Sequence, residues 1–127
     1  MKTKHVLVAV CTIMLFLWGC TDDIPFSGEY PQKGIASWYS GRITASGERF
    51  NPQSFTCAMR RTDYGKFYKV CNIDNNKCVV VRHNNFGPAK WLFIRGRIVD
   101  LSKAAFSQIA DSKEGLINVT IEAIKGE

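Results

Sequence analysis

Residues 97–123 read RIVDLSKAAFSQIADSKEGLINVTIEA, and this stretch indicates a helix followed by a strand. Apolar and polar side chains alternate through residues 117–123, which is typical of a strand with one buried face. Apolar side chains recur four positions apart in residues 105–110, which favours a helix. We expect Ser102 to be its N-cap and Gly115 to end it.

Short strands are expected throughout the preceding part of the chain, separated by polar loops. They cover residues 34–39, 56–59, 67–72, 78–83, 92–94 and 97–99. The third and fourth of these form a hairpin around Asn75 and Asn76, which tolerate the conformations of a tight turn. Residues 41–53 are polar and predict a loop, and residues 85–88 interrupt the pattern. About six short strands and one short helix predict a mainly β protein, a small closed barrel.

The composition is that of one ordinary globular domain. The chain has 127 residues, of which 46% are hydrophobic and 22% charged. These values exclude a multi-domain enzyme, a disordered tail protein and a collagen-like fibre. The formal net charge of +6 suggests an anionic partner.

The N-terminal residues 1–19 have the pattern of a secretory signal peptide. Lys2 and Lys4 precede an apolar run at residues 6–18, which is shorter than the roughly 20 residues that span a bilayer. The run ends in Leu-Trp-Gly-Cys, which resembles a bacterial lipobox, so we expect cleavage before Cys20 and lipidation of its sulfur. The alternative is a buried N-terminal helix of a cytosolic domain.

Export has consequences for location and partners. We expect a lipid-anchored protein of the bacterial cell envelope, in the outer membrane facing the periplasm if the host is Gram-negative, because Thr21 follows the cysteine. Nucleic acid is then excluded as a partner. Residues 20–33 contain two prolines and several charges and predict a flexible tether, and the folded domain is expected at residues 34–124.

Three cysteines remain after the lipidation site. Disulfides persist in an oxidising compartment, and Cys71 and Cys78 flank the tip of the expected hairpin. We favour a bond between these two and a buried thiol at Cys57, although other pairings stay open. The spacings of the three cysteines, with His83 nearby, match no zinc pattern, so no metal is expected.

Four segments occur in an order that resembles a known family. They are residues 36–39 (ASWY), 44–50 (TASGERF), 79–88 (VVVRHNNFGP) and 97–102 (RIVDLS). Together they resemble the rare lipoprotein A (RlpA) family, whose members share the double-psi β-barrel with expansins. The resemblance implies an endolytic lytic transglycosylase that cleaves peptidoglycan glycan strands, preferably those lacking stem peptides. We expect it to act as a monomer and without a cofactor. Larger members carry a further C-terminal glycan-binding domain, which we expect to be absent here.

The resemblance also implies the site residues. Glu48 stands at the position of the family's glutamate. Met59 stands where the family has a histidine, and Asn85 where it has an aspartate. Methionine cannot carry a proton, and asparagine can donate a hydrogen bond but does not titrate. Arg82 and Asn84 precede Asn85 in the shared motif, and all three, with Met59, are candidates for binding substrate.

The implied reaction needs an acid and a base. The muramic C6 hydroxyl attacks C1, and one carboxyl can serve both roles if its pKa is raised. We therefore expect Glu48 to be catalytic. Asp100 is a second catalytic candidate, because related barrels use a late aspartate near this place. Its alternative role is a carboxylate at a helix N-terminus.

Three further side chains have two interpretations each. Trp38 and Tyr39 form a sugar-stacking platform or belong to the core, and Tyr39 is the one expected to be more exposed. His83 either replaces the family's histidine or is structural. It lies two residues before Asn85, and both should face the same side of a strand.

Two functions therefore remain open. The first is a peptidoglycan lytic transglycosylase anchored to a membrane through Cys20. The second is a catalytically impaired glycan-binding or structural lipoprotein, which the residues at positions 59 and 85 favour.

Overall fold

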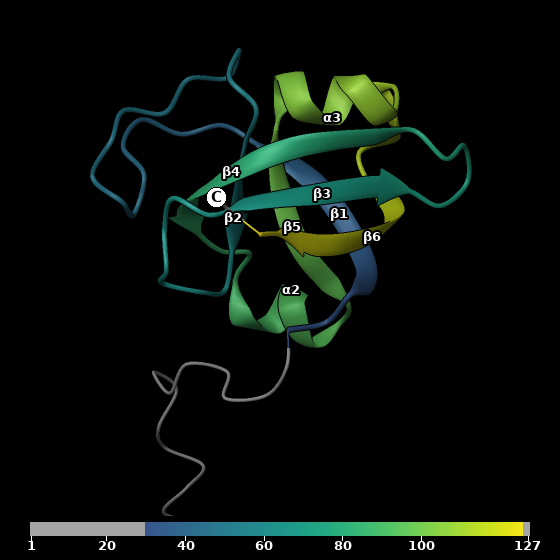
Figure 1. The fold of residues 1–127 in the computed structure, drawn as a ribbon, viewed down its shortest axis with the longest axis horizontal. Coiled ribbons are helices and arrows are strands. Elements are labelled where there is room, and N and C mark those ends of the chain that lie inside the picture. The colour runs from purple at the N-terminus through teal and green to yellow at the C-terminus, as the bar shows by residue number, and fades with distance from the viewer. Residues whose placement is uncertain (1–29, 126–127) are drawn as a thin grey trace, which may run out of the picture.

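Six strands close into one barrel in the computed structural model, which describes residues 30–125. They are β1 (Lys33–Tyr39), β2 (Thr56–Met59), β3 (Phe67–Asn72), β4 (Cys78–Phe86), β5 (Arg97–Ser102) and β6 (Ile117–Ile124). The order around the barrel is β1-β5-β2-β4-β3-β6. This confirms the expected double-psi β-barrel, and the strands wrap around one interior (Figure 1).

Two of the six neighbouring strand pairs are parallel. These are β1 with β5 and β2 with β4, and each has one register shift. The other four pairs are antiparallel. The shift in the second parallel pair matters for the candidate site, because it lies beside Asn85.

Two short helices cover opposite ends of the barrel (Figure 1). The expected helix is α3 (Lys103–Ile109), whose N-cap is Ser102 with its side chain accepting from Ala105 N–H. A 3-10 turn, η1 (Ser112–Glu114), follows it. The strand expected at residues 92–94 is wrong, because this segment belongs to α2 (Lys90–Ile94). A short apolar run fits either element.

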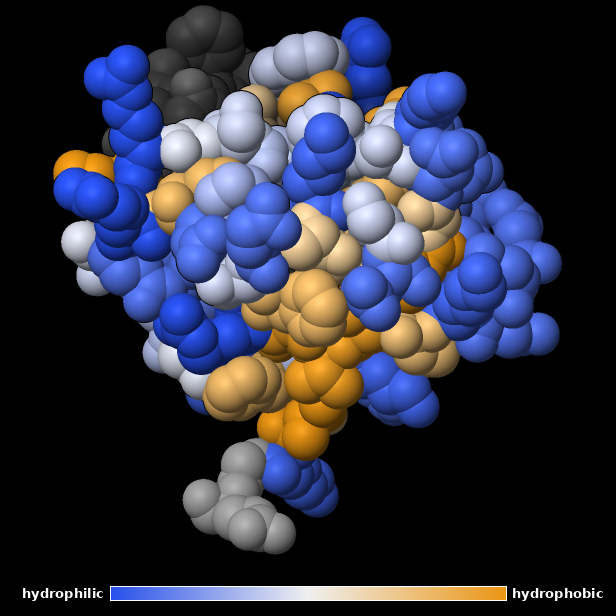
Figure 2. Space-filling model, turned by 90° about the horizontal axis from the view of Figure 1, so that it is seen from above, coloured by the Kyte–Doolittle hydropathy of each residue, from blue (hydrophilic) through white to orange (hydrophobic). Residues whose placement is uncertain are grey.

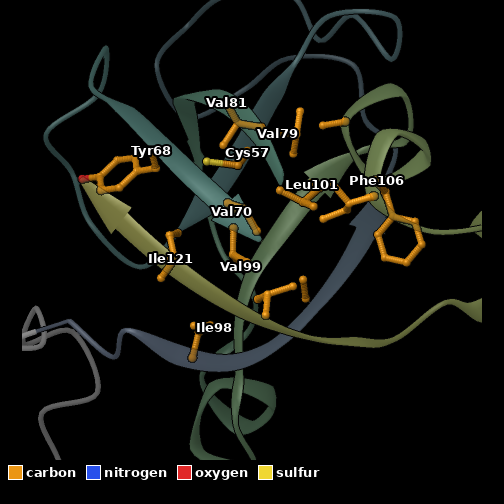
Figure 3. Close-up of a cluster of buried hydrophobic side chains, with 14 of the residues drawn as sticks. Cys57, Tyr68, Val70, Val79, Val81, Ile98, Val99, Leu101, Phe106 and Ile121 are labelled. Carbon is orange, nitrogen blue, oxygen red and sulfur yellow. The ribbon is translucent and has the colours of Figure 1, made fainter. Parts of the chain in front are cut away.

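The core fills the barrel with side chains from all six strands and from α3. Figure 3 shows Val70, Val81, Val99 and Leu101 converging in the interior, with Phe106 entering from α3. All five are essentially inaccessible to solvent. A closed sheet with its own core makes residues 30–125 a self-contained folding unit.

The β3–β4 hairpin is fastened at its tip. Cys71 and Cys78 form the disulfide that the hairpin pattern favoured, and Cys57 is a buried free thiol. The side-chain amides of Asn72 and Asn75 both donate to the Ile109 carbonyl, at 2.8 and 2.9 Å. The hairpin therefore caps the C-terminal end of α3.

The first described residues pack against the barrel. The Tyr30 hydroxyl donates to the Ile98 carbonyl, and the Gln32 carbonyl accepts from Ile121 N–H at 2.9 Å. The folded unit thus begins a few residues before the expected boundary at residue 34. The expectations for the signal peptide, for lipidation of Cys20 and for most of the tether fall outside the described residues.

The face of the described chain seen from above is mainly polar, with a strip of apolar side chains across it (Figure 2). None of the helices among residues 30–125 has the length and hydrophobicity needed to cross a bilayer.

Candidate active site

The end of β4 presents two adjacent asparagines to the same loop. Cys57 pairs with His83 and Ala58 pairs with Asn85, so Asn84 is an extra residue between the two pairs. Such a bulge interrupts the alternation of a strand. Asn84 and Asn85 therefore both contact the loop after β1, and His83 is fully buried. The expectation that His83 and Asn85 share one face is wrong for this reason.

That loop folds into a tight turn which carries Glu48. Thr44 donates to the Glu48 carbonyl from its backbone N–H at 2.9 Å and from its hydroxyl at 3.0 Å. Gly47 has φ of 93°, a conformation that favours glycine. Ser46 N–H donates to the Asn84 carbonyl at 3.2 Å, and Ala45 N–H donates to Asn85 Oδ1 at 2.8 Å. The turn is thus fixed against β4.

The Glu48 carboxylate is held by two donors from β4. Arg82 Nη2 donates to Oε1 at 2.8 Å, and Asn84 Nδ2 donates to the same oxygen. These hydrogen bonds and the Arg82 charge lower the pKa of Glu48. Glu48 is therefore ionised at neutral pH, which is unfavourable for a general acid.

Tyr39 connects this turn with the middle of the sheet. Asn85 Nδ2 donates to the Tyr39 hydroxyl at 3.3 Å, and the Tyr39 ring packs against Phe50 with centroids 4.9 Å apart. Burial and, to a smaller extent, the negative charges of Asp100 and Glu48 raise the pKa of Tyr39 to about 12, against the lowering effect of the hydrogen bond from Asn85. Tyr39 thus lies within electrostatic reach of both carboxylates and remains a neutral hydroxyl.

Asp100 lies in β5, between β1 and β2. It pairs with Ser37 on one side and with Ala58 on the other, and its residue is 8% exposed. Arg97 Nε donates to Asp100 Oδ1 at 2.8 Å. Burial nevertheless raises the pKa of Asp100, against the lowering effect of Arg97. Asp100 belongs to a strand and is not a carboxylate at a helix N-terminus.

The register places Asp100 and Asn85 in one row across the sheet. Ala58 of β2 pairs with both residues, so they are two strand spacings apart, roughly 10 Å between their backbones. We define the polar cluster as Tyr39, Glu48, Arg82, Asn84 and Asn85, with Asp100 beside it.

Two expected site residues lie elsewhere. Trp38 packs partly against the core, its ring nitrogen donates to the Ser112 carbonyl at 2.9 Å, and Lys103 lies over its ring. Met59 is 1% exposed and belongs to the core. Successive side chains of β2 point to opposite faces, and the neighbouring Ala58 lies on the outer face in one row with Asn85 and Asp100. Neither side chain reaches the polar cluster. Among residues 30–125, no three His, Cys, Asp or Glu side chains gather as a metal site would require.

Sequence reasoning missed two partners of the carboxylates. Arg97 reaches Asp100 three positions further along a strand, and Arg82 reaches Glu48 across 34 positions of sequence. Arg82 was expected to bind substrate, and no pattern in the sequence indicates which carboxylate it meets. The signal that could have linked Arg82 with Glu48 is the family resemblance, because both residues lie in segments that resemble the family.

Comparison with known proteins decides the family. Residues 31–121 match the double-psi β-barrel family described as lytic transglycolase. A probable endolytic peptidoglycan transglycosylase RlpA of a Synechocystis species is 43% identical over 96 residues. The chain belongs to the RlpA family. The corresponding protein of Neisseria meningitidis is 39% identical over 100 residues.

These RlpA relatives are considerably longer than the chain. The Synechocystis match covers 72% of this chain and 29% of the relative, and the Neisseria match covers 76% and 40%. Solved structures with the same fold include the Streptomyces papain inhibitor, with a TM-score of 0.59, 22% identity and coverage of 81% of this chain and all of that one. A Clavibacter michiganensis expansin has the same TM-score at 17% identity, covering 76% of this chain and 51% of that one. These two likenesses show the fold alone.

Proposed function

We propose that this RlpA-family protein cleaves peptidoglycan glycan strands by transglycosylation, with Asp100 as the proton carrier and Glu48 as a fixed anion. The observation that carries the proposal is the opposite shift of the two carboxyl pKa values, raised at Asp100 and lowered at Glu48. Two titratable groups with pKa values pushed apart are the usual sign of an acid and an anion that share one reaction.

The assignment differs from the one that the sequence favoured. A carboxyl that both donates and accepts a proton needs a pKa near neutrality, and the hydrogen bond from Arg82 moves Glu48 away from that value. Burial moves Asp100 towards it. Asp100 is therefore the better acid, and the ionised Glu48 is suited to stabilising positive charge on the sugar.

The proposed reaction balances without water or a cofactor. Protonated Asp100 gives its proton to the glycosidic oxygen as the bond from that oxygen to C1 breaks. The muramic C6 hydroxyl forms the new bond to C1, and its proton returns to the Asp100 carboxylate. Glu48 and the neutral hydroxyl of Tyr39 would bind and orient the sugar beside the row of polar side chains. Glycan strands without stem peptides are the proposed preferred substrate.

Binding without cleavage is the second candidate. It is favoured by the two positions at which the resemblance implies a histidine and an aspartate. The chain has Met59 and Asn85 there, and neither side chain can transfer a proton. Met59 is also buried in the core. Both Asn85 side-chain groups are also occupied, by Tyr39 and by backbone N–H groups. A protein of this kind would hold glycan strands without releasing products.

The location of the protein is a further part of the proposal. The basic residues, apolar run and Gly-Cys pair at the N-terminus support lipidation of Cys20 and anchoring in the cell envelope. In a Gram-negative host the proposed site is the outer membrane, with the barrel facing the periplasm as a monomer.

Digestion of murein tests both candidates. Peptide-free murein is incubated with the chain beginning at Thr21, and mass spectrometry detects anhydro-muramic ends. Asp100→Asn and Glu48→Gln keep the shapes of the side chains. Asp100→Asn should lower product formation by about 10²–10⁴-fold, because it removes the proton carrier. Glu48→Gln should lower it by about 10²–10³-fold, because it removes one electrostatic contact with the transition state. Glu122→Gln, an exposed position on β6, is the matched control and should keep wild-type activity.

The outcomes separate the two functions. Anhydro products that fall in both site variants support the transglycosylase. If no products form but the protein sediments with murein, the result supports binding. If no products form and the protein does not sediment with murein, both functions are contradicted. Products that persist in Asp100→Asn would remove Asp100 from the proposed mechanism.

A further inference from the structure

The short helix α2 exposes two large apolar side chains beside basic ones. Trp91 is 61% exposed and Ile94 is 72% exposed, and residues three apart lie on the same face of a helix. Lys90 and Arg95 are exposed at the two ends of the helix, and the Arg95 guanidinium lies over the Trp91 ring, 5.6 Å from its centroid. No residue of α2 is fully buried.

Trp91 and Ile94 are among the most exposed large apolar side chains of residues 30–125. Isolated exposed apolar side chains are common, but a large aromatic and a branched aliphatic side chain on one helical face mark an interaction site. Tryptophan with lysine and arginine is the combination enriched where proteins meet the lipid–water interface. Residues 86–99 contain no aspartate or glutamate, so the charged side chains of this segment are all basic and suit an anionic surface.

The chain enters the barrel at the same end. The Tyr30 ring packs against Phe93 of α2 with centroids 5.8 Å apart, and the first described residues lie on the α2 side of the barrel (Figure 1). Cys20, the proposed lipidation site, precedes Tyr30 by ten residues. Ten residues span at most roughly 35 Å, so a lipid on Cys20 would keep α2 close to the bilayer.

We propose that the exposed face of α2, formed by Trp91 and Ile94 with Lys90 and Arg95, docks on an anionic bilayer surface. The two apolar side chains enter the interface between headgroups and acyl chains, and the two basic side chains contact phosphate groups. Docking through α2 turns the opposite end of the barrel, which carries α3, away from the membrane (Figure 1). The inference rests on the proposed envelope location, but its test does not depend on glycan cleavage.

Vesicle binding by the chain beginning at Thr21 provides the test, because this form has no lipid anchor. The vesicles contain phosphatidylethanolamine with a minority of phosphatidylglycerol, and sedimentation measures the bound fraction. Ile94→Asp should weaken partitioning about tenfold or more, as expected for losing burial of one large apolar side chain. Leu116→Asp is the matched control, because Leu116 is 56% exposed and precedes β6. It should bind like the wild type.

Fluorescence reports which side chain enters the lipid. The chain from Thr21 contains two tryptophans, Trp38 and Trp91. Acyl chains carrying bromine should quench Trp91 in a Trp38→Phe variant and leave Trp38 unquenched in a Trp91→Phe variant. Binding should also fall with added salt and on vesicles of phosphatidylcholine alone.

Three results overturn the proposal. They are vesicle binding that Ile94→Asp does not weaken, quenching of Trp38 rather than Trp91, and a concentration-dependent dimer in solution that Ile94→Asp abolishes. The last would assign the face to a second copy of the chain. Murein digestion is scored separately, so failure to dock is distinguishable from failure to cleave.

Discussion

Arg82 Nη2 lies 2.8 Å from Glu48 Oε1, and this ion pair joins β4 to the loop that follows β1. It fixes the Glu48 carboxylate in its ionised form, while burial in β5 favours the protonated form of Asp100. Over the range of pH between the two pKa values, Glu48 is therefore ionised while Asp100 is protonated, although the two carboxyl groups lie near each other. The proposed mechanism depends on that difference.

Removing the arginine should release Glu48. We expect Arg82→Met to raise the pKa of Glu48 towards its ordinary value, because the charge and one hydrogen bond are lost. Carboxyl carbon chemical shifts in an NMR titration measure the change. Arg61→Met is the matched control. Arg61 pairs with Asp63 and lowers its pKa, so this variant should raise the pKa of Asp63 and leave that of Glu48 unchanged. An unchanged titration of Glu48 in Arg82→Met would contradict the assigned cause.

Asp100 should make the fold less stable as the pH rises. Its pKa is higher in the folded protein than in the unfolded chain, so the stability linked to its proton is complete below the unfolded value of 3.8. That stability is lost as the pH rises through the folded value. Asp100→Asn should abolish this loss, and urea unfolding at a series of pH values measures it.

Asp63 provides a control of the opposite sign. Arg61 and Lys66 lower its pKa, so its contribution is present above its ordinary pKa and lost as the pH falls. Asp63→Asn should therefore change the acid side of the stability profile and leave the loss of stability towards neutral pH, which is linked to Asp100, unaffected. If Asp63→Asn and Asp100→Asn alter the same side, the assigned shifts are wrong.

Much of the fold could be predicted from the sequence because its elements follow local patterns. The strands at residues 56–59 and 67–72 have the expected bounds, and Ser102 is the expected N-cap. The segment at residues 92–94 is a helix and not the expected strand. The N–H groups of Leu92 and Phe93 donate to the Ala89 carbonyl, and α2 is too short for a periodic pattern of apolar residues to reveal it. Gly96, with φ of 102°, follows this helix.

The candidate site could be predicted only in part because it depends on one extra residue. The bulge at Asn84 adds one residue between His83 and Asn85. Regular alternation would place these two side chains on the same face of β4, whereas His83 is buried and Asn85 contacts the loop. Glu48 and Asp100 were identified from the family motif. Their charge states follow from Arg82 and from burial, which are long-range features of the folded chain.

Ser102 should contribute to stability through more than its helix cap. Its hydroxyl donates to the Ser54 carbonyl at 2.6 Å and accepts from the Thr56 and Ala105 N–H groups. Ser102→Ala removes all three bonds in a buried position, and we expect a loss of about 2 kcal/mol in the free energy of unfolding. Ser107→Ala, an exposed position on the same helix, should change it by less than about 0.5 kcal/mol. Chemical denaturation compares the two.

The Cys71–Cys78 disulfide closes a short loop, so its contribution should be moderate. Replacing both cysteines by serine should lower the free energy of unfolding by about 2 kcal/mol, mainly through the entropy of the unfolded chain. Chemical denaturation with and without reductant measures it. Reductant should destabilise the wild type by a similar amount and leave the double variant unchanged. A double variant as stable as the wild type would show that the hairpin is held by Asn72 and Asn75 instead.

Restoring the family's histidine at position 59 should not create a catalytic group. Met59 is buried and packs in the hydrophobic core, so a histidine at this position would bury a polar ring. We expect Met59→His to lower the free energy of unfolding by about 1–3 kcal/mol and to leave murein digestion no faster. Met59→Leu, which keeps the volume, should lose less than about 1.5 kcal/mol. Faster release of anhydro products by Met59→His would mean that the end of β2 can turn its side chain towards the polar cluster, and that the difference from the family is catalytic rather than structural.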